Sequence, residues 1–366
     1  MNTIIPWVGI IFTLILVVQG FIIPKSKIGF FLQSTWIIIL TSFNSGGGDW
    51  IGNESYYWVT SIDTSKNVFS NIYPLLVNCF RSRGTSFITF NGVMSFIASL
   101  IIMFIIYRTA ENKNLVMSFW TIFPVIDNVI QKRAYYGLAL VVVAISIILN
   151  NKNHKFLRIV IFEMIIFIAM RIHSMYFLYF MVPFFLLLND KWKKYISLMG
   201  ITAGFILKSQ IQTFVNLIMG PSAISKSELY FNKLASTATL SHTIFWAIWQ
   251  LSQLLIIIYV NKYLSNNNRG SILLSLNWWG LLLIPLYSFN PVFTRVFRAI
   301  ILFNYIDVAD VLANKNSHNF KPYIALMSEL LFALITFYMM DVNSNGLIQN
   351  VYPIFQDNYL LNIFNL

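Results

Sequence analysis

Four arginines lie within apolar stretches or at their ends, where a charged side chain is costly. Arg133 and Arg171 are at the ends of apolar stretches, and Arg295 and Arg298 are just inside another. An arginine at bilayer depth costs on the order of 2.5 to 3.5 kcal/mol on insertion scales, so it needs a partner or a wet cavity. Its guanidinium is a planar fork of donors that matches phosphate and carboxylate groups. The arginines therefore predict a site for an anionic group, and His173, two residues after Arg171, could line an adjacent wall of it.

Each arginine also has a structural interpretation. Arg133 and Arg171 could extend to the outer lipid headgroups, with their stems on apolar surface. Arg295 and Arg298 are three residues apart, so a helix places them on one face. There they could pair with an acid such as Asp127, near the outer end of the fourth apolar stretch. The sequence leaves both interpretations open.

The longest polar loop, 44–71, carries acidic and aromatic side chains beside three consecutive glycines. No Gly-Lys-Ser/Thr follows these glycines and no strand precedes them, so they do not form a phosphate-binding loop. We expect a flexible turn whose rings could stack on sugars and whose carboxylates could act as a base. Alternatively, its Trp and Tyr residues mark the membrane interface. The side chains concerned are Asp49, Trp50, Glu54, Tyr56, Tyr57 and Trp58.

The elements that position these side chains follow from composition. The 366 residues are 57% hydrophobic and 10% charged, against about 25% charged in ordinary globular proteins, which excludes a soluble enzyme. Each membrane-spanning helix needs about 20 apolar residues. We predict an all-α polytopic integral membrane protein, a single domain over 1–366, in which 44–84 form an outer loop plus an interfacial or re-entrant helix. The expected spans are about twelve: 4–23, 28–43, 85–107, 115–130, 133–150, 157–173, 175–188, 195–218, 241–264, 271–289, 291–312 and 322–340.

Positive charge predicts the orientation of these spans. The net charge of +12 concerns membrane topology here and is not evidence for nucleic-acid binding, since short cytoplasmic loops collect Lys and Arg. Fourteen cations fall in alternate loops, with Lys outnumbering Arg 11 to 3. We therefore expect these loops inside, both termini outside, and the first apolar segment retained as a span. The fourteen are Lys25, Lys27, Arg108, Lys113, Lys152, Lys155, Arg158, Lys191, Lys193, Lys194, Lys262, Arg269, Lys315 and Lys321. The outer side and the spans hold the other eleven cations, of which six are arginines: Arg81, Arg83, Arg133, Arg171, Arg295 and Arg298.

Metal chemistry has little support in the sequence. Cys79 is the only cysteine, so neither an internal disulfide nor a cysteine zinc site can form. No His-Glu-x-x-His or similar cluster is present. We expect no metal and no cofactor.

Three segments resemble the EpsG family of Wzy-type polysaccharide polymerases, which join lipid-linked repeat units on the outer face of the bacterial membrane. Asp49 followed by tyrosines is similar to the family's Gly-x-Asp plus Tyr loop. The segment 126–139, which contains Arg133 and precedes a helix ending in Arg171 and His173, is similar to its Asn-x-x-Arg-Gln-x-Leu-Ala segment. Phe293 to Arg298 resembles its late Arg-containing span. The sequence departs from the family at 71–74, where Asn-Ile-Tyr-Pro replaces an acidic Glu-Pro-Gly-Tyr segment.

The resemblance implies a metal-independent glycosyltransferase of the bacterial cytoplasmic membrane, with its catalytic face outside. Its substrates would be glycans on polyprenyl pyrophosphate. The four arginines would bind the pyrophosphate, the general base would be His173 or Asp49, and Trp50, Glu54, Tyr56 and Tyr57 would contact the glycan. Membrane lipid and a chain-length regulator are the other partners implied, and a GT-C-like architecture stays open.

Two other classes remain as alternatives. A membrane glycosyltransferase with a lipid-phosphate sugar donor would share the large outer loop and the acidic base. A lipid-linked oligosaccharide flippase would also have about a dozen spans and cavity arginines, although many transporters show internal repeats, which this sequence lacks.

Overall fold

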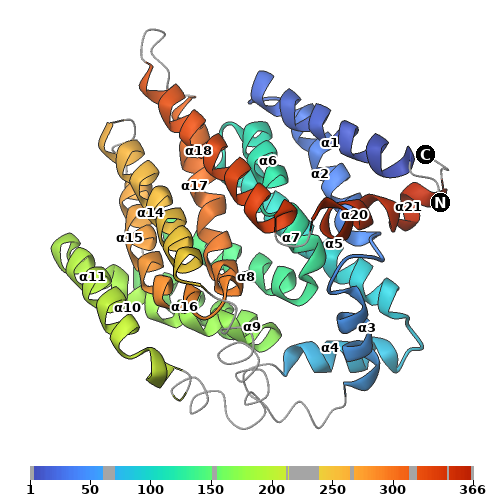
Figure 1. The fold of residues 1–366 in the computed structure, drawn as a ribbon, viewed down its shortest axis with the longest axis horizontal. Coiled ribbons are helices and arrows are strands. Elements are labelled where there is room, and N and C mark those ends of the chain that lie inside the picture. The colour runs from blue at the N-terminus through green and yellow to red at the C-terminus, as the bar shows by residue number, and fades with distance from the viewer. Residues whose placement is uncertain are drawn as a thin grey trace.

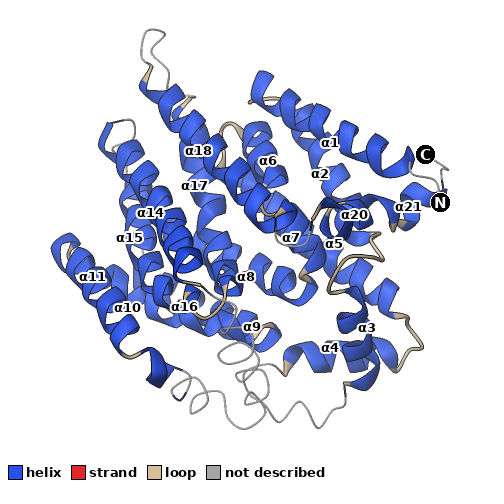
Figure 2. Ribbon diagram, viewed as in Figure 1, coloured by secondary structure: helices blue, strands red, loops and turns tan. Residues whose placement is uncertain are grey.

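Helices account for nearly all of the regular structure (Figure 2). The structure is a computed structural model, and it describes residues 4–60, 71–150, 155–211, 213, 239–263, 268–312, 320–343 and 346–363. Within these residues no strand occurs, and one isolated β-bridge joins Asn44 to Asn358. The all-α prediction is therefore confirmed.

The described residues of the first half of the chain form nine α-helices, of which the longest matches the predicted span 85–107. They are α1 (Ile4–Ile22), α2 (Lys27–Ser42), α3 (Trp50–Val59), α4 (Ile72–Arg81), α5 (Phe87–Thr109), α6 (Lys113–Ile122), α7 (Val125–Ile130), α8 (Lys132–Leu149) and α9 (Lys155–Ile172).

The second half contains more short and irregular helices. They are the 3-10 helix η2 (Ser174–Met181), α10 (Val182–Leu187), α11 (Asp190–Ile206), α14 (Leu240–Tyr263), α15 (Asn268–Gly280), η6 (Leu281–Leu283), α16 (Ile284–Tyr287), the 3-10 helix η7 (Pro291–Phe297), α17 (Arg298–Val311), α18 (Lys321–Phe337), the π-helix η8 (Tyr338–Val342), α19 (Leu347–Asn350), α20 (Tyr352–Gln356) and α21 (Tyr359–Ile363).

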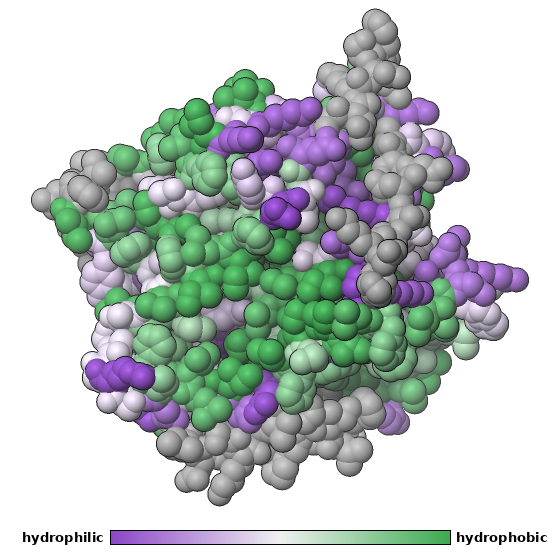
Figure 3. Space-filling model, turned by 180° about the vertical axis from the view of Figure 1, so that it is seen from behind, coloured by the Kyte–Doolittle hydropathy of each residue, from purple (hydrophilic) through white to green (hydrophobic). Residues whose placement is uncertain are grey.

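Five of the described helices are long and apolar enough to cross a membrane: Phe87–Thr109, Lys132–Leu149, Leu240–Tyr263, Arg269–Tyr287 and Lys321–Val342. Pro6–Ile22, Lys27–Ser42 and Ser174–Leu187 are shorter apolar helices. Figure 3 shows hydrophobic residues in a broad band across one face of the molecule. These features indicate a multi-pass membrane protein. The count of twelve spans and a GT-C-like architecture stay predictions.

Several expected spans are not single α-helices, among them 115–130 and 291–312. The range 115–130 is divided into α6 and α7 at Pro124, whose missing N–H cannot continue the helical ladder. The range 291–312 begins with the 3-10 helix η7 and becomes α-helical only at Arg298. Both breaks lie close to the arginines that the sequence singles out.

The prediction of a flexible turn near Asp49 is wrong for most of that segment. Trp50 to Val59 form α3, and α4 starts just after Asn71. Asn53 and Tyr57 are four residues apart, so they lie on one face of α3, and both are buried. The Tyr57 hydroxyl donates to the Thr85 carbonyl at 2.7 Å. This buried face fixes α3 against the start of α5 and makes the segment helical. The interfacial or re-entrant helix predicted within 44–84 corresponds to α4.

Helix connections that carry the predicted cytoplasmic cations contact one another. The Asn114 N–H donates to the Pro24 carbonyl, and Arg269 donates to the Thr109 carbonyl at 3.2 Å. The Lys321 ammonium lies 5.1 Å from the centre of the Tyr263 ring. These contacts place the junctions α1–α2, α5–α6, α14–α15 and the start of α18 at one end of the bundle. Which end faces outside stays a prediction.

The helix α17 is the centre of the molecule. Thirteen of its 14 residues are buried, and it contacts α6, α8, α14, α15 and α18. A helix that is buried on nearly all sides is a core helix of the bundle. Figure 1 shows α14, α15, α17 and α18 side by side, with α3 and α4 at the lower right.

A chain of buried polar side chains joins the four helices of this group. Gln253 on α14 donates to Glu329 on α18 at 2.8 Å. Asn304 on α17 donates to Gln253 at 2.6 Å, and Asn277 on α15 donates to Asn304 at 2.8 Å. Such bonds between apolar helices contribute about 0.6 kcal/mol each on average, so they fix which helix faces which more than they add stability.

Candidate active site

The start of α8 is the point where the predicted site residues meet. The Arg133 guanidinium lies 4.5 Å from the centre of the Tyr56 ring on α3 and 5.6 Å from that of Tyr73 on α4. Tyr73 is buried and stacks on Tyr136, one turn after Arg133, at 6.5 Å between ring centres. Burial raises the pKa of Tyr73, while the Arg133 charge opposes the rise. Three helices therefore hold Arg133 between aromatic rings.

Arg171 contacts the residue that precedes α4. Its Nε donates to the side-chain oxygen of this residue, Asn71. Its guanidinium also lies 5.2 Å from the centre of the Phe167 ring. Since Arg133 contacts Tyr73 and Arg171 contacts Asn71, both arginines touch the first residues of α4, and both are half-buried.

His173 lies at the turn between α9 and η2. Its ring centre is 6.0 Å from that of Tyr176, and the Tyr176 hydroxyl donates to the Ala134 carbonyl at 2.6 Å. Because Ala134 follows Arg133 in the chain, this bond ties the His173 turn to the start of α8. Arg295 and Arg298 both interact electrostatically with the same Tyr176, so they too lie near this point.

Arg298 is paired inside the protein. Its Nη2 is 2.7 Å from Asp127 Oδ2, and the side chains of both residues are less than a tenth exposed. Its Nη1 donates to the Gln131 side-chain oxygen at 2.8 Å, and Asp341 is close enough to both charges to interact with them. The structural interpretation of Arg298, a pairing with Asp127, is therefore confirmed. Arg295, in contrast, is half-buried.

The glycine loop packs beside this cluster. Gly47 has φ of +102° and lies against Ile130 at the end of α7, a backbone conformation that glycine adopts at little cost. The Lys132 ammonium lies 5.9 Å from the centre of the Trp50 ring. Asp49, at the start of α3, is exposed, and Glu54 is half-buried. The loop is thus brought to the start of α8, with the Asp49 carboxylate at the surface.

Tyr57 does not lie on the surface predicted to bind glycan. It is buried beside Thr85, and Arg81 donates to its carbonyl at 3.2 Å. Tyr57 therefore positions α3, whereas Tyr56 and Trp50 remain partly exposed.

Sequence reasoning missed four residues of this site: Asn71, Tyr73, Gln131 and Asp341. Asn71 and Tyr73 occupy the segment that lacks the family's acid, and that departure was a signal worth following. Gln131 lies two residues before Arg133 and gave no signal of its own. Among the described residues, no group of three or more His, Cys, Asp or Glu side chains could hold a metal ion.

The helices and the arginine cluster define a multi-pass membrane protein with a polar site at one end of the bundle. The chain belongs to the EpsG family, whose model matches residues 27–353, a family of membrane proteins of the Wzy-type polysaccharide polymerase kind. Comparisons with curated proteins and with solved structures gave no match. Family membership indicates a polysaccharide polymerase-type role and a glycosyltransferase-like enzyme in general.

Proposed function

We propose that this protein joins polyprenyl-pyrophosphate-linked oligosaccharide repeat units into a surface polysaccharide on the outer face of the bacterial cytoplasmic membrane. The observation that carries the proposal is the convergence of Arg133, Arg171, Arg295 and His173 around the start of α8. A site that stabilises a leaving pyrophosphate needs fixed positive charge of this kind.

The four arginines differ in whether a carboxylate already pairs with their charge, and we assign them different roles on this basis. Arg298 is already neutralised by Asp127, so in our proposal it holds α7 against α17. Arg133 and Arg171 contact rings and an amide oxygen, and no described carboxylate lies within ion-pairing distance of either. Their charge is therefore available to a pyrophosphate, and we place Arg295 beside them.

In the proposed reaction the growing glycan passes from its lipid carrier to a sugar hydroxyl of the incoming unit. The bond between the anomeric carbon and the pyrophosphate oxygen breaks, and its electron pair leaves with the lipid pyrophosphate. The acceptor oxygen forms the new bond to that carbon. His173 takes the hydroxyl proton, because it lies within the cluster and imidazole is the most common general base in enzymes. We place Tyr56, Trp50 and Glu54 along the glycan, and Asp49 is the competing base.

The first experiment is to delete the gene and identify the lipid-linked glycan that accumulates. Complete repeat units exposed outside, with long polymer lost, are expected. Complete units kept inside would indicate a flippase, and truncated units would indicate a glycosyltransferase with a lipid-phosphate sugar donor. An unchanged glycan profile would overturn the proposal.

Complementation with variants then tests the residues. We expect Arg133→Ala, Arg171→Ala and His173→Ala each to lower polymer synthesis by about 10²- to 10³-fold, as the loss of one charge-stabilising donor does in other enzymes, with protein levels unchanged. Arg83→Ala is the matched control, since Arg83 is an exposed arginine just after α4 and its Nη1 contacts only Cys79 in the described part. Full activity of the Arg133 and Arg171 variants would remove them from the site.

A further inference from the structure

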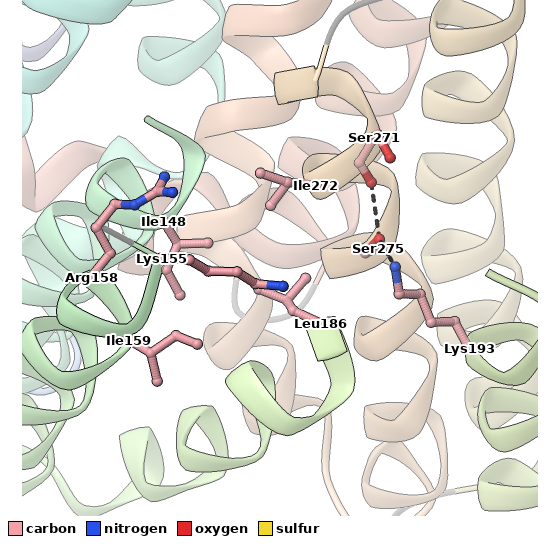
Figure 4. Close-up of a pocket in the computed structure, with 9 residues that line it drawn as sticks. All are labelled: Ile148, Lys155, Arg158, Ile159, Leu186, Lys193, Ser271, Ile272 and Ser275. Atoms are coloured by element: carbon pink, nitrogen blue, oxygen red, sulfur yellow. Dashed lines mark hydrogen bonds between the residues drawn. The ribbon is translucent and has the colours of Figure 1, made fainter. Parts of the chain in front are cut away.

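Figure 4 shows a basic cavity. Ile148, near the end of α8, lines it, so it lies at the opposite end of this helix from the arginine cluster. The cavity volume is about 290 Å³, and the cavity lies between the end of α8, the start of α9, α10, α11 and α15. The 18 residues of α8 run from the arginine cluster to this cavity. At about 1.5 Å per residue they separate the two by about 27 Å, close to the thickness of a bilayer's hydrocarbon core.

Among the described residues, three cations line the cavity and no acid does. Lys155 and Arg158 come from α9 and Lys193 comes from α11. Figure 4 shows Lys155 and Lys193 projecting into it from opposite sides. The hydroxyls of Ser271 and Ser275 and the side chains of Ile148, Ile159, Leu186 and Ile272 complete the lining.

The three charges are only partly compensated. Lys193 is buried and lies 3.0 Å from the exposed carboxylate of Asp190 and 2.9 Å from the Ser275 hydroxyl. Arg158 donates through Nη1 to the Asn150 carbonyl, a neutral group. Neither Lys155 nor Arg158 forms an ion pair with a described acid. The cavity therefore has an excess of positive charge that favours an anion.

The rim of the cavity has the character of a membrane interface. Phe156 and Leu157, between the two α9 cations, are 80% and 54% exposed, and Trp192, next to Lys193, is 56% exposed. Large apolar side chains beside cations at the end of a helix bundle fit a lipid with its tails on the outside and its headgroup in the cavity. Basic pockets between membrane helices bind anionic headgroups elsewhere.

We propose that this cavity is a second anion site, which binds the phosphate of an anionic lipid headgroup or, failing that, free phosphate, through Lys155, Arg158 and Lys193. The site is separate from the arginine cluster and does not depend on the polymerase function. Its volume is near the lower limit of small-molecule pockets, about 300 Å³, which suits a phosphate with its glycerol but not a whole repeat unit.

The test is a binding measurement on the purified full chain in detergent. Phosphatidylglycerol, phosphatidylcholine and inorganic phosphate are titrated separately, and bound lipid is counted by native mass spectrometry. We expect phosphatidylglycerol to bind more tightly than phosphatidylcholine, and the variant K155Q/R158Q to weaken its binding about tenfold, which corresponds to about 1.4 kcal/mol. The matched control is K25Q/K27Q, which removes two exposed cations elsewhere at the same end.

Each outcome decides the proposal. If inorganic phosphate displaces the lipid at equal concentration, the site belongs to free phosphate. If both double variants lose the same affinity, or phosphatidylcholine binds equally well, the cavity is not an anion site. Thermal melting in lipid-free detergent shows whether the K155Q/R158Q protein is folded. If it is not, the single variant Lys155→Gln, at an exposed position, is tested in its place.

Discussion

The Arg298 and Asp127 side chains form a buried ion pair. Their separation is 2.7 Å, and Gln131 binds the same guanidinium. Breaking a buried pair from one side leaves an uncompensated charge, which costs about 3 to 5 kcal/mol. The pair is therefore important for folding as well as for the position of α7.

We expect Arg298→Ala to lower the melting temperature and the amount of protein in the membrane, because Asp127 and Asp341 would lose their buried cation. The double variant D127N/R298Q should be less destabilised, since it leaves no unpaired charge at these two positions. Melting of both proteins in detergent measures the difference. An Arg298→Ala protein that melts normally but makes no polymer would instead assign Arg298 to substrate binding.

At the residue level the sequence identified the charged groups and one partner, Asp127 for Arg298, but not the partners of Arg133 and Arg171. Arg133, Arg171 and Arg298 were conspicuous because charge in an apolar stretch is costly. Nothing local indicates that Arg171 meets Asn71, one hundred positions away, since such contacts depend on how the helices pack.

At the element level, hydropathy predicted where helices occur. This works because every backbone polar group in a bilayer must be satisfied within its own helix. It failed where one buried face or one proline decides the outcome, as for α3, with Asn53 and Tyr57 on its buried face, and for the division at Pro124.

The contact between α8 and η2 depends on a glycine. A Cβ at Gly137 would lie 2.4 Å from the Tyr176 ring, so the ring would have to move. We expect Gly137→Ala to destabilise the protein by about 1 to 3 kcal/mol, as overpacking does, and to displace the Tyr176 hydroxyl from Ala134. The readout is thermal melting in detergent.

Gly52→Ala, on α3, is the control for Gly137→Ala, because nothing lies within 4 Å of a Cβ there and alanine favours a helix by about 1 kcal/mol. It should melt at the same temperature or slightly higher. If both substitutions destabilise the protein equally, the loss of stability does not come from the α8–η2 contact.

At the level of the whole molecule, the lone cysteine reports orientation. Cys79 is exposed on α4, at the arginine end. We expect an impermeant maleimide to label it in intact cells. In a Cys79→Ser background, Lys191→Cys, at an exposed position of α11, should react only after the membrane is opened. The reverse pattern would place the arginine cluster in the cytoplasm and contradict the proposed function.

The polar chain through α14, α15, α17 and α18 has a consequence for how this sequence can evolve. Replacing Gln253 alone by an apolar residue would remove the hydrogen bond that Glu329 accepts and one of those that Asn304 donates, and a buried unsatisfied group costs about 1 to 3 kcal/mol. Single steps at 253, 277, 304 or 329 should therefore be selected against, whereas concerted exchange is tolerated. Across relatives these four positions should vary as a set, and that covariation would identify the helix pairing without any structure.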